Sequence, residues 1–204
     1  MDLGLSGKVA IVTGGASGMG ACVGRLLAAE GVRVVLADIQ AEKGQATAQE
    51  MRAGGSDVRF MAANVSVRDQ VETLISNTLA ELGQIDILCN IAGPGASSGQ
   101  LDTTMEEYDR QLDGHLRGVF NCVQVVLPHM MERRYGRLIA TGSCITEVAD
   151  FGGLGGDVLV LLPQLLLEHA ALAPGIGAGS CSCGLARCRR RHDLQPRLLP
   201  ARRG

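Results

Sequence analysis

Five short apolar runs alternate with amphipathic stretches along the first 143 residues. The runs are rich in β-branched and aliphatic residues, which predicts buried strands of a parallel sheet. The stretches between them carry apolar residues at helical spacing, and several stop at glycine, which predicts helices. The expected strands are residues 8–13, 32–39, 58–65, 85–91 and 137–141, and the expected helices are residues 19–30, 41–53, 67–82 and 104–134.

Two of these helices carry local signals at particular residues. Ser66 and Asp69 stand at capping-box spacing and are expected to open the helix of residues 67–82. The helix of residues 104–134 contains Gly114 and Pro128, and we expect it to bend near these two positions.

Strands that alternate with helices in short βαβ units predict an α/β fold with a doubly wound parallel sheet of Rossmann type. The expected strand order is 3-2-1-4-5. In such sheets ligands bind beyond the carboxyl ends of the strands, where the order reverses between strands 1 and 4. The residues that end the strands are therefore the first place to search for a functional site.

The alternation of strand and helix stops near residue 150. Residues 151–157 are rich in glycine, residues 158–167 are rich in leucine, and the last thirty residues are dominated by small residues and then by arginine, proline and leucine. We therefore divide the chain into a domain of residues 1–150 and a divergent tail of residues 151–204, with the last strands of the sheet missing. A disordered tail or a shift of reading frame would explain the abrupt change.

Composition narrows the class of protein. Hydrophobic residues make up 46% of the chain but aromatic residues only 2%, so the core must be built from aliphatic side chains. The formal net charge is −2, because seven arginines after residue 180 offset an acidic body. No basic leader with an apolar run and no membrane-spanning stretch is seen. The cysteines scattered through the body are distributed as reduced, buried cysteines of intracellular proteins usually are, so we expect them to be buried. We also expect a cytoplasmic location and no membrane partner.

A glycine-rich turn, Thr13-Gly14-Gly15-Ala16-Ser17-Gly18-Met19-Gly20, joins the first expected strand to the first expected helix. Glycines let the backbone approach a diphosphate closely, and the free N–H groups that open a helix attract its charge. A glycine cluster alone could be an ordinary turn, but the flanking strand and helix supply the context of a dinucleotide site.

Asp38, about 20 residues beyond the glycines, ends the second expected strand and favours NAD over NADP as the cofactor. A carboxylate there accepts hydrogen bonds from ribose hydroxyls and would repel a 2′-phosphate. Neither the glycine loop nor Ile39 brings an Arg or Lys to offset that repulsion. Asp38 could instead cap the following helix, and the two roles are compatible.

The spacing Thr-Gly-x-x-x-Gly-x-Gly resembles the short-chain dehydrogenase/reductase family, and further motifs of that family follow in order as far as residue 143. Asn64-Val65 matches a pair that contacts adenine, and Asn90-Ile91-Ala92-Gly93 matches a motif that supports the sheet and passes the nicotinamide ribose. Asn90 could also simply satisfy neighbouring backbone groups. The resemblance implies a cofactor site formed by Gly14, Ser17, Gly18, Met19, Gly20, Asp38, Ile39, Asn64, Val65, Asn90, Ala92 and Gly93.

Two further positions match catalytic positions of the family. Ser143, after the fifth expected strand, stands where the family has a serine that orients the substrate carbonyl, although it could be a plain strand-end residue. His115 stands in His115-Leu116-Arg117-Gly118, where the family usually has Asn-x-x-Gly and the asparagine helps to hold water in a proton relay. His115 could equally be an ordinary helix histidine.

The family's tyrosine, with a lysine four residues later, is missing from the chain. The only lysines are Lys8 and Lys43, and the only tyrosines are Tyr108 and Tyr135. The resemblance implies hydride transfer between NAD(H) and a carbonyl or secondary alcohol of a small molecule, and this loss implies that the transfer is impaired. The alternative is a non-catalytic nucleotide-binding protein or a defective, truncated product.

The tail offers two other partner classes, and we favour neither. Cys181, Cys183, Cys188 and His192 match no reliable zinc spacing, so we predict no metal site. The arginines of residues 187–191 lack interleaved aromatic residues, so we predict no nucleic-acid partner. A homo-oligomer through the helix of residues 104–134 is conceivable, but the partner helix usual in related dimers is not recognisable in the altered C-terminal part.

Overall fold

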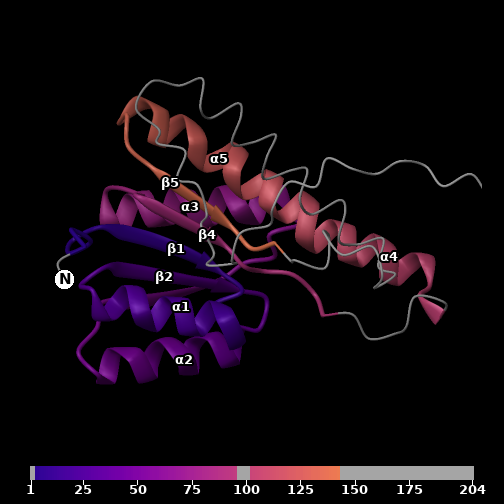
Figure 1. Ribbon diagram of the computed structural model, residues 1–204, viewed down its shortest axis with the longest axis horizontal. Helices are drawn as coiled ribbons and strands as arrows, with labels where there is room; N and C mark the ends of the chain where they lie inside the picture. Colours follow the sequence, from indigo (N-terminus) through magenta and orange to yellow (C-terminus); the bar gives the residue numbers. More distant parts are fainter. Residues whose placement is uncertain (1–2, 96–101, 143–204) are drawn as a thin grey trace, which may run out of the picture.

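The computed structural model describes residues 3–95 and 102–142. They form a five-stranded parallel sheet in the order β3-β2-β1-β4-β5, with helices on both faces, as the sequence predicts (Figure 1). The strands are β1 (Val9–Thr13), β2 (Arg33–Asp38), β3 (Val58–Ala62), β4 (Ile87–Asn90) and β5 (Arg137–Ala140), and the helical elements are α1 (Gly18–Ala29), α2 (Ala41–Ala53), α3 (Arg68–Leu82), α4 (Met105–Leu112), η2 (Asp113–Arg117) and α5 (Gly118–Glu132).

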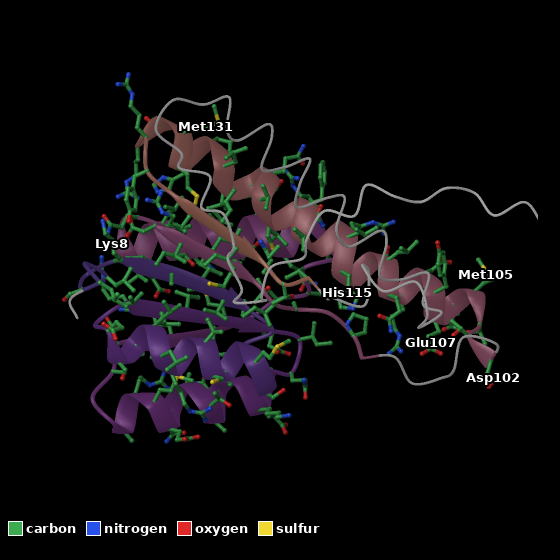
Figure 2. The ribbon with its side chains drawn as sticks, viewed as in Figure 1. Lys8, Asp102, Met105, Glu107, His115 and Met131 are labelled. Atoms are coloured by element: carbon green, nitrogen blue, oxygen red, sulfur yellow. The ribbon has the colours of Figure 1, made fainter. Side chains whose placement is uncertain are left out.

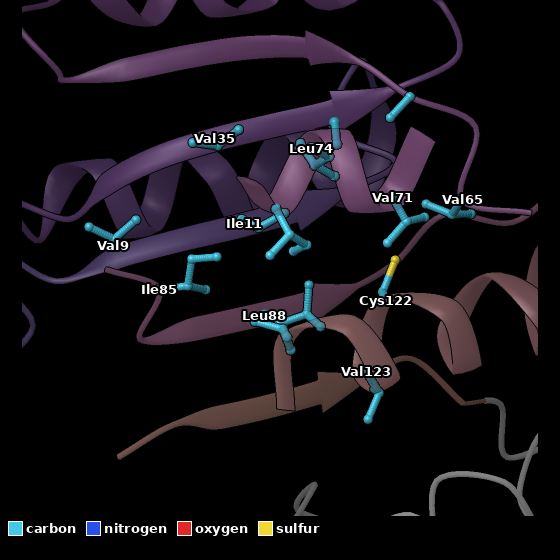
Figure 3. Packing of buried hydrophobic residues seen from close by; sticks show 14 of the residues in the cluster. Val9, Ile11, Val35, Val65, Val71, Leu74, Ile85, Leu88, Cys122 and Val123 are labelled. Carbon is cyan, nitrogen blue, oxygen red and sulfur yellow. The ribbon is translucent and has the colours of Figure 1, made fainter. Parts of the chain in front are cut away.

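Two apolar layers sandwich the sheet because its strands are buried on both faces. One layer packs β1, β2 and β4 residues such as Ile11 and Leu88 against α3 and α5 (Figure 3). The other packs Val12, Leu36 and their neighbours against α1 and α2. Aliphatic side chains make up almost all of both layers, so the core is packed without many aromatic residues.

The amino ends of the strands carry an ion pair between a buried carboxylate and a partly exposed guanidinium. Asp86, fully buried just before β4, accepts a hydrogen bond from the Val9 N–H at 2.9 Å and pairs with the Arg133 guanidinium at 3.1 Å. This cluster joins β1, β4 and the end of α5. It lies at the opposite end of the sheet from the glycine loop.

The third strand is shorter than predicted, and the capping box predicted for the helix that follows it is wrong. β3 ends at Ala62 because the chain then turns, and the Asn64 Oδ1 accepts the Ser66 N–H at 3.0 Å. Helix α3 begins at Arg68 after Val67, whose side chain makes no capping bond. The Ser66 hydroxyl reaches away to the Asp113 carbonyl at 3.0 Å, so it is not available to the helix.

The predicted helix of residues 104–134 is interrupted near Gly114, as expected. Its middle turn, η2, has the wider π-helical pattern, and such turns mark departures from regular α-helix that often lie at functional sites. Gly114 packs so closely on Pro94 that a side chain there would overlap the proline ring. Pro128, in contrast, lies within α5, which continues to Glu132.

Candidate cofactor site

The glycine loop lies at the carboxyl end of β1 and opens α1. Gly14 and Gly18 have φ angles of +71° and +51°, which favour glycine. Gly20 packs onto the Gly14 carbonyl with no room for a side chain. Ser17 makes no side-chain capping bond, and the first bond of the helix joins the Ala21 N–H to the Ser17 carbonyl. The N–H groups of residues 18–20 are therefore directed outward, as a diphosphate requires.

Asp38 holds the glycine loop in place. Its side chain is 8% exposed, and Oδ2 accepts the Ala16 N–H at 3.0 Å while Oδ1 accepts the Gln40 N–H at 2.9 Å. The Ala16 carbonyl in turn accepts the Thr47 hydroxyl of α2 at 3.0 Å. A carboxylate has about four acceptor positions, so these two bonds leave capacity for ribose hydroxyls.

The helix-capping alternative for Asp38 has partial support. The Gln40 N–H that it accepts lies at the N-cap of α2, and Gln40 itself makes no side-chain capping bond. Asp38 therefore stabilises the turn into α2 as well as the glycine loop. Ile39 and Met19, both predicted to line the cofactor, are 69% and 67% exposed. Such exposure leaves both apolar side chains free to cover a ligand.

The turn after β3 brings Asn64 and Val65 beside the end of β2. The Asn64 N–H donates to the Gln70 Oε1 at 2.8 Å, and its own side chain closes the turn at Ser66. Val65 is 8% exposed and packs in the core with Val71 and Cys122 (Figure 3). Any contact of this pair with adenine would therefore fall to Asn64 or to the backbone rather than to the valine side chain.

Thr13 fixes the turn after β4. Its buried hydroxyl donates to the Cys89 carbonyl at 3.4 Å and accepts the N–H groups of Ile91 and Ala92 at 3.0 and 3.1 Å. Gly14 also approaches the Ala92 backbone closely. The glycine loop and the segment containing Ala92 and Gly93 are thus joined where the order of the strands reverses.

Asn90 has a buried amide with no partner in the part of the chain that the structure describes. The side chain is 3% exposed, and neither its nitrogen nor its oxygen has a hydrogen-bond partner. The alternative that its side chain satisfies neighbouring backbone groups is therefore wrong. The backbone carbonyl of Asn90, in contrast, accepts the Thr141 N–H at 3.1 Å. An unpaired buried amide costs about 1–3 kcal/mol, so a further polar group is expected at this end of β4.

His115, in η2, lies over the turn that follows β4. Its Nε2 is 3.1 Å from the Pro94 carbonyl, and its ring packs so closely on Gly93 that a methyl group there would overlap it. Figure 2 shows His115 at the end of the sheet opposite Lys8. The structure brings His115 together with Gly93, whereas Ser143 lies outside the described residues.

Neither tyrosine of the chain lies beside the carboxyl ends of β1 and β4, where Thr13 and Asn90 are found. Tyr135 packs under the Lys8 ammonium, 4.1 Å from the ring centroid, at the amino ends of the strands. Tyr108 lies in α4, which extends beyond the sheet (Figure 1). The missing Tyr/Lys pair is therefore not replaced by a tyrosine from elsewhere in the described part of the chain.

Residues 8–154 match the family model for short chain dehydrogenases. The chain belongs to the short-chain dehydrogenase/reductase family. This is a family of oxidoreductases that use nicotinamide dinucleotides and act on small-molecule carbonyls and alcohols. The resemblance noted in the sequence is thereby confirmed, and the sheet order has the form expected for the family.

Curated relatives of this short-chain dehydrogenase/reductase include reductases from plants and bacteria. Tropinone reductase-like 2 of Erythroxylum coca is 37% identical over 153 residues, covering 73% of this chain and 54% of that protein. The 3-oxoacyl-[acyl-carrier-protein] reductase of Staphylococcus aureus is 34% identical over 146 residues, covering 71% of this chain and 59% of that protein. The chain thus spans little more than half the length of these relatives.

A solved structure of a short-chain dehydrogenase/reductase from Burkholderia phymatum, in complex with NAD, superposes with a TM-score of 0.80 at 26% identity. It covers 85% of this chain, which corresponds to 64% of that one. Within the described residues, no helix is long and apolar enough to cross a membrane, and no cluster of three metal-ligating side chains occurs. The cysteines and histidine of the tail lie outside those residues.

Three side chains that support the site of this family member were missed in the sequence. Thr13 was visible only as part of the glycine motif, and Thr47 gives no signal because polar residues are ordinary on a half-exposed helix. Asn121 had a weak one: it and Gln124 are the two amides in the otherwise apolar stretch of residues 119–127. It is buried, and its Nδ2 donates to the Val65 carbonyl at 2.9 Å.

Proposed function

We propose that this chain binds NAD(H) and descends from oxidoreductases that transfer hydride between NAD(H) and a carbonyl or secondary alcohol of a small molecule. The observation that carries the proposal is the pairing of Asp38 with the glycine loop. The carboxylate and the outward N–H groups of α1 lie together at the carboxyl ends of β1 and β2. That pairing suits a diphosphate joined to an unphosphorylated ribose.

The order of the strands supports a proposal for where the remaining parts of the dinucleotide would bind. The diphosphate would rest on residues 14–20 after β1 and the adenosine ribose on Asp38 after β2, with Ile39 alongside. The adenine would then lie beyond β3 at Asn64, and the nicotinamide half beyond β4 near Gly93. The unpaired Asn90 amide under the β4 end fits a site that a ligand or an ordered water completes.

The substrate half of the reaction is the impaired part. A bound nicotinamide would supply the acceptor for the hydride of the alcohol carbon, and the alcohol oxygen would have to release a proton as the carbonyl forms. Ser143 would orient that oxygen and His115 would lie nearby, but the chain has no Tyr-x-x-x-Lys to exchange the proton. General acid–base assistance typically contributes ~10²–10⁴ in rate, so turnover should fall by that order.

The second candidate is a protein that binds the nucleotide without turnover. The observation that favours it is the same absence of the Tyr/Lys pair, since the residues that would hold the dinucleotide are present while those for proton exchange are not. A defective, truncated product would be the limiting form of this alternative. The two candidates share the binding step and differ only in chemistry.

Calorimetric titration of the full chain with NAD⁺, NADH and NADP⁺ tests the binding step. We expect NAD⁺ to bind at least about tenfold more tightly than NADP⁺, because a buried carboxylate beside a 2′-phosphate is repulsive. Asp38→Ser should weaken NAD⁺ by about tenfold or more through loss of charge-assisted hydrogen bonds. Folded protein that binds none of the three at millimolar concentration contradicts the proposal.

A turnover screen separates the two candidates. Secondary alcohols with NAD⁺ and ketones with NADH are followed at 340 nm, at protein concentrations high enough to detect rates far below those of ordinary enzymes. Slow turnover that Ser143→Ala abolishes supports the impaired enzyme. Tight NADH binding with no turnover of any substrate supports the non-catalytic protein.

A further inference from the structure

The turn of residues 63–67, between β3 and α3, is held from two neighbouring elements. Asn121 of α5 donates its amide N–H to the Val65 carbonyl at 2.9 Å, and the Ser66 hydroxyl donates to the Asp113 carbonyl of η2 at 3.0 Å. Gly118, at the start of α5, packs on the Val65 side chain with no space for a methyl group between them. Three separate contacts therefore fix this turn against η2 and α5.

Burial of the Asn121 amide carries a desolvation penalty, which its hydrogen bond offsets. Its side chain is 7% exposed and is surrounded in sequence by apolar residues of α5, including Cys122 and Val123. A leucine of similar volume would fill the same space without desolvating an amide. The bond spans 56 residues of sequence, so its effect is to set the position of a turn on another element.

The position of that turn follows from the strand order. Asp38 ends β2, and the turn after β3 lies next to it on the side away from β1. The Ala63 N–H donates to the Asp38 carbonyl at 3.0 Å, which keeps the start of the turn beside the ribose position. A base attached to that ribose and directed away from the diphosphate would therefore lie over residues 64 and 65.

We propose that Asn121 is a positioning residue for the adenine end of the dinucleotide. It acts through the Val65 carbonyl and touches no ligand atom itself. This inference rests on the proposed NAD(H) function and adds to the proposed site a supporting residue from α5. The nicotinamide side is contacted by His115 of η2 at the Pro94 carbonyl, whereas the Asn121 bond comes from α5, so a change at Asn121 leaves the His115 contact in place.

Binding of NADH and of ADP-ribose by the full chain tests the proposal. ADP-ribose lacks the nicotinamide, so the ratio of the two Kd values measures the nicotinamide contribution alone. In Asn121→Leu, we expect both Kd values to rise by the same factor, about three- to tenfold, because one hydrogen bond is lost at the adenine end. The ratio between them should stay as in the unmodified chain.

Two further variants complete the experiment. Ser66→Ala removes the other tether of the same turn from a half-exposed position, and it should also raise both Kd values at an unchanged ratio. Gln124→Ala removes an exposed amide from the same helix, which bonds only to Arg68 in the described part of the chain, and it should leave both Kd values unchanged. Circular dichroism and cooperative thermal unfolding establish that each variant is folded.

The outcomes distinguish this inference from the proposed function. Wild-type binding of NADH with unchanged Kd values in folded Asn121→Leu and Ser66→Ala overturns the positioning role alone. A ratio that changes along with both Kd values also overturns it, since the whole site would then have loosened. If Asn121→Leu does not fold, Ser66→Ala decides between these results. Failure of the unmodified chain to bind either ligand overturns the proposed function, and the inference with it.

Discussion

At the scale of single residues, the strongest predictions from sequence were those that depend on backbone geometry. The positions of Gly14, Gly18 and Asp38 were identified from spacing alone, because a tight strand-to-helix turn demands glycine, and Asp38 ends β2 as predicted. Thr13, Thr47 and Asn121 were not, because their roles depend on partners at least 31 residues away. A single sequence does not reveal which distant backbone group a threonine or asparagine side chain will meet.

Thr13 provides a test at this scale. Thr13→Val keeps the shape of the side chain but leaves the N–H groups of Ile91 and Ala92 without their acceptor. We expect a loss of about 1–3 kcal/mol in the free energy of unfolding, measured by urea denaturation. Thr73→Val is the matched control, since that exposed hydroxyl bonds only within its own helix, and it should change stability by less than about 0.5 kcal/mol. Equal stabilities of the two variants would count against the bridging role of Thr13.

At the scale of secondary-structure elements, periodicity predicted every strand and helix of the described residues but not their junctions. The helix of residues 41–53 has the predicted limits, whereas β3 is shorter by three residues because Asn64 and Ser66 form a turn. Within the long helix, the sequence gives only Gly114 as a sign of the interruption at η2. The η2 turn is also where the long helix packs on Pro94 and Gly93, two contacts that the periodicity does not reveal.

Gly93 and His115 test that packing between elements. Gly93→Ala should destabilise the chain by about 1–3 kcal/mol, because the added methyl overlaps the imidazole. Gly93→Ala combined with His115→Ala should cost less than the sum of the two single changes, since the smaller side chain frees the space. Gly95→Ala, where an added methyl meets no atom within 4 Å, is the neutral control. Additive losses in urea denaturation would show that the two residues are not coupled.

At the scale of the whole molecule, the sheet separates two kinds of interaction. Its amino end carries paired charges that are already satisfied, as in the Asp86–Arg133 pair, whereas its carboxyl end carries outward N–H groups and the unpaired Asn90 amide. The sequence predicted the carboxyl-end half of this division, because the expected strand order places the residues of the candidate cofactor site at that end, but it did not predict the ion pair at the amino end. The arrangement of residues 143–204 lies outside the structure, so the predicted tail stays a prediction.

Alkylation of Cys89 and Cys122 can show whether the two layers of this molecule unfold together, because each layer contains one of these cysteines. Burial raises the pKa of Cys89 to about 11 and that of Cys122 to about 12, and the two thiols lie in opposite layers of the sandwich. Cys22, in contrast, is exposed, which corrects the expectation that the scattered cysteines are buried. We expect iodoacetamide at pH 8 to label Cys22 in the native chain and to label Cys89 and Cys122 only in urea.

Cooperative unfolding predicts one urea midpoint for Cys89 and Cys122, read by mass spectrometry of their separate peptides. Different midpoints would mean that the layer of α1 and α2 opens independently of the layer of α3 and α5. The peptide of Cys22 serves as the internal reference, because its labelling should not depend on urea. Native labelling of Cys89 or Cys122 at the rate of Cys22 would contradict their burial.

Anyone wishing to redesign the chain for a phosphorylated coenzyme meets an obstacle at position 38. Under the proposed function, removing the acid would relieve the clash with the extra phosphate, but it would also deprive the Ala16 amide of its acceptor and loosen the loop proposed to hold the diphosphate. A successful exchange must therefore combine a basic side chain at position 39 with a short acceptor, such as serine or asparagine, at position 38. Asp38 thus supplies both the charge proposed to select the coenzyme and the acceptor that holds the first turn, so a substitution that alters one also alters the other.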